Sequence, residues 1–256
     1  MNVPSPFPWQ LRLEHEGAAA ISLERQGRRI RFDPRRPVDA DDIVILTGNW
    51  PEHVQATLEA VQAGLNPTVV AAPEIVKWLA EKGALQPHEG DAVIDGVQIQ
   101  TEAYQPIPKH TPKEFMFKVG SALVRPDRAA RRLVKRARLP DPLPRIVQLT
   151  FPDGSRFLHL HLSLHKSTPA DWLERAIEKY GGADWVVIGV DHEEADAVRD
   201  RIGRFGGKHI LFTDLIAEVR RHLGLPTNLL TPLVDQVLSD GVAAYVLVSQ
   251  ACFRFE

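Results

Sequence analysis

The stretch 43–54, IVILTGNWPEHV, carries three local structural signals in direct succession. Its first four residues are continuously apolar, which is typical of a strand covered on both faces of its sheet. Thr47-Gly48 then predicts a turn, and Pro51 stands where the first turn of a helix tolerates proline. Apolar residues continue at helical spacing as far as Leu65. The stretch therefore predicts a buried strand, a tight loop and a helix.

The segments on either side extend this pattern to the whole chain. Residues 9–34 alternate between apolar and polar side chains, which predicts short strands with one wet face. Residues 156–165, RFLHLHLSLH, alternate strictly and predict one strand with its imidazoles on a single face. Strands and helices then alternate from residue 168 onward. The order predicts two mixed sheets covered by helices in one domain.

Composition places the chain among ordinary globular proteins. Of its 256 residues, 44% are hydrophobic and 25% are charged, and the net charge is −2. Such a balance argues against a chain built as a whole to bind nucleic acid or anionic membranes. The lone Cys252 can form neither an internal disulfide nor a cysteine-based zinc site. With no apparent secretory signal or apolar membrane-spanning run, the sequence predicts a cytoplasmic location.

Asp33-Pro34 follows an early strand, and Thr47 ends the buried strand ahead of GNWPEHV. In this order of elements, over nearly its whole length, the chain resembles the metallo-β-lactamase superfamily. The resemblance implies an αββα sandwich over residues 1–256, in which two mixed β-sheets are flanked by helices and the active site lies at one edge between them. In that family the threonine is followed by a His-x-His-x-Asp-His string, whose ligands hold two metal ions for hydrolysis.

That string is degenerate in this chain. Gly48 and Trp50 stand where the first two histidines belong, Glu52 replaces the aspartate, and His53 keeps the last histidine. A glycine has no ligand atom and an indole N–H is only a donor, so one metal position loses two ligands. The resemblance implies two further ligand positions later in the chain. The vestigial candidate metal ligands are His53, Glu52, His110 and Asp214.

The position of the family's bridging aspartate falls within 157–165, where this chain has no aspartate. His161, Ser163 or His165 stands at that point, and the alignment leaves the choice open. The imidazoles of this strand favour a structural, partly exposed face, and a ligand or metal site and a pH-sensitive contact are the alternatives. Trp50 is interpreted as a filler of the space left by the missing ligands, with a ligand-stacking surface as the alternative. The candidate ligand-binding residues are Trp50, His161 and His165.

The leading hypothesis is a protein of this fold without catalytic activity or cofactor, acting as a ligand- or protein-binding module. The alternative is a hydrolase of ester or phosphodiester bonds that uses one zinc, manganese or iron ion. Metal analysis separates the two hypotheses: near-stoichiometric zinc, manganese or iron favours the hydrolase, and no metal favours the binding protein.

Residues 125–145 form a basic segment, with eight basic and two acidic residues, that resembles an insert between core strands. It predicts a helix with a proline-rich exit. Three roles stay open: a solvated helix, a contact with a protein partner or a second copy, and, less favoured, a nucleic-acid contact. No membrane contact is expected. The candidate partner contacts are Arg128, Arg131, Arg132, Lys135 and Arg136.

Overall fold

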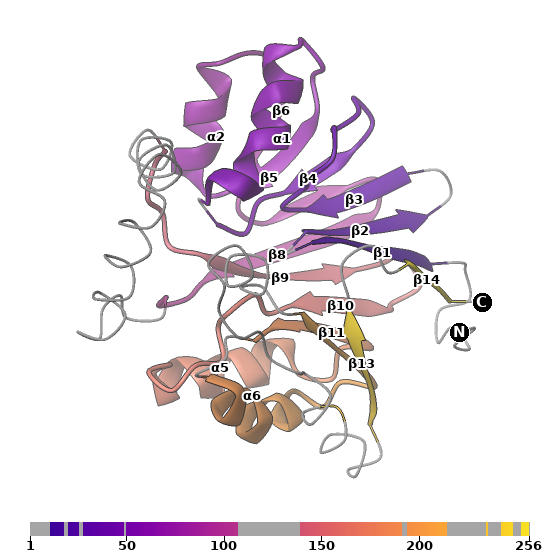
Figure 1. Ribbon diagram of the computed structural model, residues 1–256, viewed down its shortest axis with the longest axis vertical. Helices are drawn as coiled ribbons and strands as arrows, with labels where there is room; N and C mark the ends of the chain where they lie inside the picture. Colours follow the sequence, from indigo (N-terminus) through magenta and orange to yellow (C-terminus); the bar gives the residue numbers. More distant parts are fainter. Residues whose placement is uncertain are drawn as a thin grey trace, which may run out of the picture.

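Two seven-stranded β-sheets with helices on their outer faces make up the described part of the chain (Figure 1). This computed structural model describes residues 11–17, 20–25, 28–48, 50–106, 139–190, 194–213, 234, 242–247 and 252–255. Across the first sheet the strand order is β14 (Cys252–Phe255), β1 (Leu11–Gly17), β2 (Ala20–Arg25), β3 (Arg28–Phe32), β4 (Ile43–Ile45), β5 (Thr68–Ala71) and β6 (Gln86–Glu89). Across the second it is β13 (Ala243–Leu247), β12 (His209–Thr213), β11 (Trp185–Gly189), β10 (Arg156–His159), β9 (Arg145–Thr150), β8 (Val97–Ala103) and β7 (Ala92–Ile94).

The helices lie on the two outer faces (Figure 1). The first sheet carries α1 (Pro51–Gln62) and α2 (Pro73–Ala80), and the second carries α5 (Ala170–Tyr180), α6 (Ala195–Ile202) and the short 3₁₀ turn η2 (Gly203–Phe205). Both α1 and α2 begin with proline at the first helical position, as the sequence predicts. The layer order is helix, sheet, sheet, helix, so the predicted αββα fold class is confirmed. No described helix is long and apolar enough to cross a membrane.

Both sheets are mixed, and each has an antiparallel and a parallel part. In the first sheet β1, β2 and β3 pair antiparallel, whereas β3 to β6 pair parallel. In the second, β7 to β10 pair antiparallel and β10 to β13 pair parallel. In the first sheet the connections from β4 to β5 and from β5 to β6 run through α1 and α2, as parallel neighbours require a crossover segment, whereas a loop joins β3 to β4. Loops at the carboxyl ends of these parallel strands carry the candidate site.

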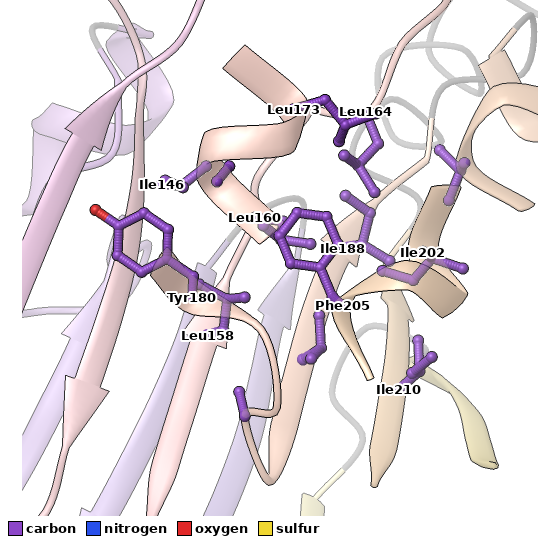
Figure 2. Packing of buried hydrophobic residues seen from close by; sticks show 14 of the residues in the cluster. Ile146, Leu158, Leu160, Leu164, Leu173, Tyr180, Ile188, Ile202, Phe205 and Ile210 are labelled. Carbon is purple, nitrogen blue, oxygen red and sulfur yellow. The ribbon is translucent and has the colours of Figure 1, made fainter. Parts of the chain in front are cut away.

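Three apolar clusters hold the layers together. The cluster between the sheets confirms the predicted alternation, since every second residue of β2 and β3 points inward: Ile21, Leu23, Ile30 and Phe32. A second cluster joins α1 and α2 to β4 and β5. The third packs α5, α6 and η2 on the second sheet, and its largest fully buried members are Tyr180, Phe205 and Phe212. Tyr180 and Phe205 are labelled in Figure 2. Buried side chains of this size each contribute about 1.5–3 kcal/mol.

The strand predicted over 156–165 is wrong beyond its first four residues. β10 ends at His159, and residues 161 and 162 form a turn in which His161 has a φ of +51°. The parallel pairing with β11 continues only through the hydrogen bonds from Leu160 N to Val187 O and from Gly189 N to His161 O. The left-handed backbone then redirects the chain, so the histidines of this segment do not share one strand face. The alternation of apolar and polar residues cannot show that the strand ends at His159, because Leu162 and Leu164 beyond the strand end are buried as well.

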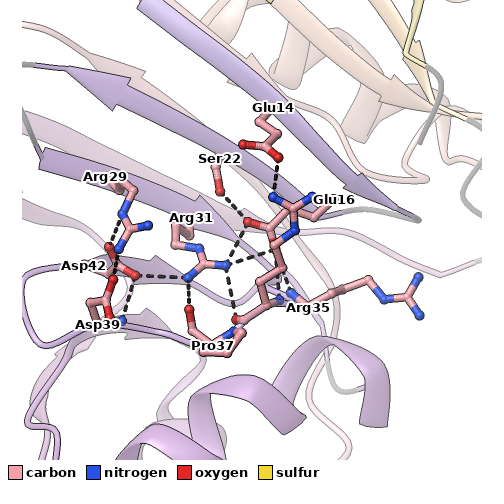
Figure 3. A network of polar contacts seen from close by, with 10 residues as sticks. Glu14, Glu16, Ser22, Arg29, Arg31, Arg35, Pro37, Asp39 and Asp42 are labelled. Carbon is pink, nitrogen blue, oxygen red and sulfur yellow. Dashed lines mark hydrogen bonds and ion pairs between the residues drawn. The ribbon is translucent and has the colours of Figure 1, made fainter. Parts of the chain in front are cut away.

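A buried ionic network lies on the first sheet beside the loop that joins β3 to β4 (Figure 3). Arg31 is 2% exposed and forms ion pairs with Glu16 at 2.8 Å and with Asp42 at 3.1 Å. Asp42 also accepts from Arg29 Nε at 2.9 Å, and Ser22 Oγ donates to Glu16 at 2.6 Å. The charges of the described side chains thus meet opposite charges or hydrogen-bond donors, as a buried ion pair requires.

Candidate functional site

Asp33 begins the site, directly after β3. Its φ is +45°, a left-handed conformation that aspartate tolerates better than most residues, and its side chain is fully buried. Thr47, just beyond β4, donates to it twice: the backbone N–H reaches Oδ1 at 2.8 Å, and the hydroxyl donates to Oδ2. Because β3 and β4 are parallel neighbours, their carboxyl ends bring these two residues together. The carboxylate is therefore held in one orientation at the edge of the sheet.

His53 enters the site from the first turn of α1. Its Nδ1 lies 3.5 Å from Asp33 Oδ2, and its side chain is buried. The half-buried Trp50, which precedes the helix, stacks on the imidazole with a centroid distance of 5.4 Å and an interplanar angle of 25°. The helix start and the tryptophan together fix the ring beside the carboxylate.

His161 completes the cluster from the second sheet, on the turn that follows β10. Its ring meets that of His53 edge-on, with centroids 5.9 Å apart. Nδ1 lies 2.5 Å from the hydroxyl oxygen of Tyr104, which comes just after β8. Nε2 is buried and has no hydrogen-bond partner within the described residues. Tyr104 thus fixes the Nδ1 side of the imidazole, and Nε2 remains available as a ligand atom.

These residues offer three metal-ligand atoms that all lie within 4.8 Å of one another. Zinc is bound by imidazole nitrogen and carboxylate oxygen at about 2.1 Å, so tetrahedral ligands lie about 3.4 Å apart. The separation of 3.5 Å between His53 Nδ1 and Asp33 Oδ2 matches that spacing. The donor chemistry also suits manganese or iron. Asp33, His53 and His161 therefore fit one divalent ion.

The described residues offer no ligand set for a second metal ion. Gly48, at the position that the resemblance gives to the family's first ligand, is buried, and a Cβ placed on it would contact His53 Nδ1 at 3.9 Å. The second such position holds Trp50, whose indole has no ligand atom. Within the described residues, the donors present are enough for one ion and not for a pair.

Burial dominates the electrostatics of the cluster. It raises the pKa of Asp33 to about 6, against the opposing effects of His161 and of the Thr47 hydrogen bonds. It lowers the pKa of His161 to about 4, although the Asp33 charge works in the other direction. His159, which stacks on Phe32 and faces His161, has its pKa lowered well below the usual value by burial and by the neighbouring histidines. The imidazoles of His159 and His161 are thus neutral at pH 7, and a histidine must be neutral to bind a metal.

The structure separates the predicted site residues. Of the candidate metal and ligand-binding residues, it brings His53, His161 and Trp50 together. His165 lies apart in the same loop, where Nε2 contacts the carbonyl of Gln105 at 2.9 Å and the backbone N–H donates to Thr168 Oγ1. Glu52 is on α1, with its side chain outside the described atoms. The remaining predictions lie outside the described residues: His110, Asp214, Arg128, Arg131, Arg132, Lys135 and Arg136.

The sequence analysis did not identify Asp33 and Tyr104 as members of the site. Asp33 served only as a landmark in the Asp-Pro dipeptide, although an acidic residue directly after a strand is a recognisable site position. Tyr104 had no signal, because 57 residues separate it from His161 and only the tertiary fold brings them together. The aspartate was thus detectable from the sequence, and the tyrosine was not.

Comparisons with known proteins agree with this architecture. No protein-family model and no curated protein matches the sequence. Among solved structures, a metallo hydrolase from the archaeon Ignicoccus hospitalis matches with a TM-score of 0.63 and 14% identity, covering 96% of this chain and 99% of that one. The chain has the metallo-β-lactamase fold.

Other neighbours of this metallo-β-lactamase-fold chain carry different activities. An isothiocyanate hydrolase from Delia radicum gut bacteria matches with a TM-score of 0.59 and 14% identity, over 96% of this chain and 99% of that one. The diiron β-hydroxylase CmlA from Streptomyces venezuelae matches with a TM-score of 0.60 and 12% identity, over 98% of this chain and 55% of that one. At such identities the likeness concerns the fold, and the chemistry must be argued from the site itself.

Proposed function

We propose that this chain binds one divalent metal ion at Asp33, His53 and His161, and that it acts by binding rather than by hydrolysis. The observation that carries the proposal is the burial of all three donors, which are 0%, 1% and 3% exposed. A buried, closed set of ligands is the mark of a structural metal site, whereas a catalytic site keeps a position open to substrate. The ion would join the two sheets at their shared edge.

Each residue has a distinct part in holding the ion. Asp33 supplies a carboxylate oxygen oriented by Thr47, and its negative charge balances part of the ion's charge. His53 approaches from α1, and His161 approaches from the second sheet. When bound, the ion would supply Lewis-acid chemistry, and the residues around it would determine whether a substrate could reach it. Trp50 lies over His53 and occupies space that a substrate would need.

One observation favours a second candidate, a single-metal hydrolase. Three protein ligands leave one position of a tetrahedral ion for water, which is the usual arrangement of catalytic zinc. The space beside Gly48, 3.9 Å from His53 Nδ1, is on the side where such a water would be placed. The metallo hydrolase and the isothiocyanate hydrolase among the structural neighbours share the fold in which this chemistry is known.

Metal content and activity together test the proposal. The protein is purified without chelator, and zinc, manganese and iron are measured per chain. We expect one ion per chain in the wild type, about one in His88→Ala, whose imidazole is on β6 away from the cluster, and none in His53→Ala. Esters, lactones and phosphodiesters should show no turnover.

The outcomes discriminate between the candidates. Two ions per chain about 3.5–4 Å apart, the spacing of working two-metal hydrolases, would contradict the one-metal site. A wild type without metal would leave a metal-free binding protein. Turnover that His53→Ala abolishes and His88→Ala retains would establish the hydrolase instead.

The location and the partners belong to the same proposal. The lone Cys252 supports a cytoplasmic setting, and the basic segment 125–145 supports a contact with a protein partner or with a second copy. Such a contact would be electrostatic and therefore sensitive to salt. The test is native mass at low and high ionic strength.

A further inference from the structure

We propose that Tyr104 is a positioning residue, whose hydroxyl holds Nδ1 of His161 so that Nε2 faces Asp33 and His53. The inference rests on the proposed metal site and names the residue that sets the geometry of one of its ligands. It concerns the tautomer and the orientation of an imidazole, which can be observed with or without metal.

Tyr104 is held firmly by its own surroundings. It is buried, and its backbone N–H donates to the carbonyl of Pro144 at 2.9 Å. Its ring packs at 6.1 Å from that of Trp172, whose Nε1 donates to the carbonyl of Ala103 at 3.2 Å. The peptide that joins Ala103 to Tyr104 is thus tied through its carbonyl to α5 and through its N–H to the chain ahead of β9. The hydroxyl is presented from a rigid support, as a positioning group must be.

The hydroxyl makes two contacts, and both are with the turn that carries His161. It lies 2.5 Å from Nδ1, and it accepts a hydrogen bond from the backbone N–H of Leu162 at 3.3 Å. The same group therefore holds the ring and the peptide that follows it. Since the turn has a left-handed residue at position 161, this double contact fixes both the backbone and the side chain at the place where the strand ends.

The tautomer of His161 follows from which atom donates. Without metal, the hydroxyl donates to Nδ1 and the proton of the imidazole is on Nε2, the nitrogen that has no hydrogen-bond partner among the described residues. If Nε2 held a metal ion, the imidazole proton would be on Nδ1 and would be donated to the Tyr104 oxygen. A hydroxyl can both donate and accept, so it supports either tautomer without a change of position.

Removal of the Tyr104 hydroxyl should allow the His161 ring to change its orientation and its tautomer. In Tyr104→Phe the imidazole loses its only described side-chain hydrogen bond, and the ring can rotate so that either nitrogen faces the cluster. Groups that orient a metal-ligating histidine from behind typically change metal affinity 10–100-fold when they are removed. The effect should therefore appear in metal affinity more strongly than in thermal stability.

The experiment compares Tyr104→Phe with Tyr180→Phe. Tyr180 is a matched control, because it is also buried and its hydroxyl donates to Glu102 at 3.1 Å, outside the cluster. Zinc and cobalt affinities are measured by chelator competition, melting temperatures are measured in parallel, and histidine ¹⁵N NMR reports the tautomer of His161. We expect about 10–100-fold weaker binding in Tyr104→Phe and less than about threefold change in Tyr180→Phe.

Each result decides the matter. Equal affinity of Tyr104→Phe and the wild type, or an equal loss in both variants, would overturn the inference. If the wild type binds no metal, the proposed function fails, and the NMR arm still decides about Tyr104. There we expect a single Nε2–H tautomer in the wild type and in Tyr180→Phe, and a mixture in Tyr104→Phe. An unchanged His161 spectrum in Tyr104→Phe would refute the positioning role.

Discussion

Two buried polar groups stand at opposite ends of the loop that joins β3 to β4, and they differ in how their charges are balanced. At one end, the Arg31 network joins guanidinium groups to carboxylates at 2.8–3.1 Å. At the other, the cluster of Asp33, His53 and His161 gathers one carboxylate and two imidazoles around an Nε2 atom without a described partner. In the first group the buried charges meet opposite charges, although Arg31 Nε has no hydrogen-bond partner among the described residues, whereas the second group holds ligand atoms that suit a cation.

The comparison teaches how to separate a structural polar group from a candidate site. Both are buried, so burial alone does not distinguish them. In the cluster, burial raises the pKa of the carboxyl of Asp33 to about 6 and lowers that of His161 to about 4, which is the pattern that accompanies functional sites. In the Arg31 network, the Ser22 hydrogen bond and the Arg31 charge hold the pKa of Glu16 below its usual value against the effect of burial. We infer that the network stabilises the fold and that the cluster binds a ligand.

The largest effect should come from breaking the network. Arg31→Met leaves Glu16 and Asp42 buried without their guanidinium partner, and removing one partner of a buried pair costs about 3–5 kcal/mol. We expect the free energy of unfolding to fall by that amount in urea titrations. Arg29→Met is the control, because Arg29 is more exposed and should cost about 1 kcal/mol or less. Equal losses of unfolding free energy in Arg31→Met and Arg29→Met would contradict the stabilising role of the buried Arg31 pairs.

The next effect concerns pH and the cluster. Because the pKa of Asp33 is about 6, a metal ion must displace a proton from the carboxyl below that pH. We expect the zinc affinity to be nearly constant above pH 7 and to fall up to about tenfold per pH unit below 6. His161, with a pKa of about 4, adds no proton competition in this range. Chelator competition between pH 5 and 7.5 measures the slope.

Asp33→Asn is the control for the pH prediction, because the amide does not titrate in this range. A pH slope of zinc affinity that persisted in this variant would show that Asp33 is not the titrating ligand.

The folding stability of the metal-free protein is a poorer measure of this titration. The raised pKa of Asp33 contributes stability that is lost as the pH rises from about 4 to 6, whereas the lowered pKa of His161 contributes stability that is lost as the pH falls through the same range. The two contributions oppose each other.

A smaller effect should follow from rebuilding the family string. In Gly48→His with Trp50→His, the space beside His53 would hold a new imidazole, and we expect zinc to bind about tenfold tighter, or about 1.4 kcal/mol. Hydrolysis should still be absent, because the segment 157–165, where the resemblance places a bridging aspartate, contains no aspartate. Phosphodiesterase and lactonase assays with zinc or manganese check this. Robust turnover would mean that the bridging position has been misassigned.

The smallest effect should come from the basic segment, which lies largely outside the described residues. Leu139 packs against the cluster formed by α1 and α2, so the deletion should end before it. We expect a chain lacking 126–138, closed by a short Gly-Ser turn, to melt within about 3 °C of the wild type, because closure entropy depends weakly on loop length. If the segment binds a partner, the native mass should change. Extending the deletion through Leu139 should lower the melting temperature further, and global unfolding of the shorter deletion would place the segment in the core.

Much of the fold could be predicted from the sequence, because the signals were local. Ile30 and Phe32 alternate as an inward-facing strand must, and Pro51 marks the start of α1. The mixed sheets and their helical covers follow from the order of such elements. Nothing in that order depends on the residues of the site, so the same fold forms with Gly48 and Trp50 at positions where the resemblance expects histidine ligands.

The site was only partly predictable, because its geometry depends on the backbone between elements. Periodicity assigned His161 to a strand, whereas its left-handed φ turns it toward His53. Sequence spacing could not show that Tyr104 would approach it, since that contact joins two strand ends of the second sheet. Residues that lie on regular elements were thus easier to place than residues that lie just beyond them.

The stack of Trp50 on His53 also makes the site optically accessible. An indole whose ring centroid lies 5.4 Å from a ligand imidazole should change its fluorescence when that imidazole becomes charged or coordinates an ion. The other tryptophans contribute a constant background, and Trp50→Phe isolates the signal by subtraction. The residue that displaced a metal ligand from the family string can therefore serve as the spectroscopic reporter of whatever the remaining ligands bind.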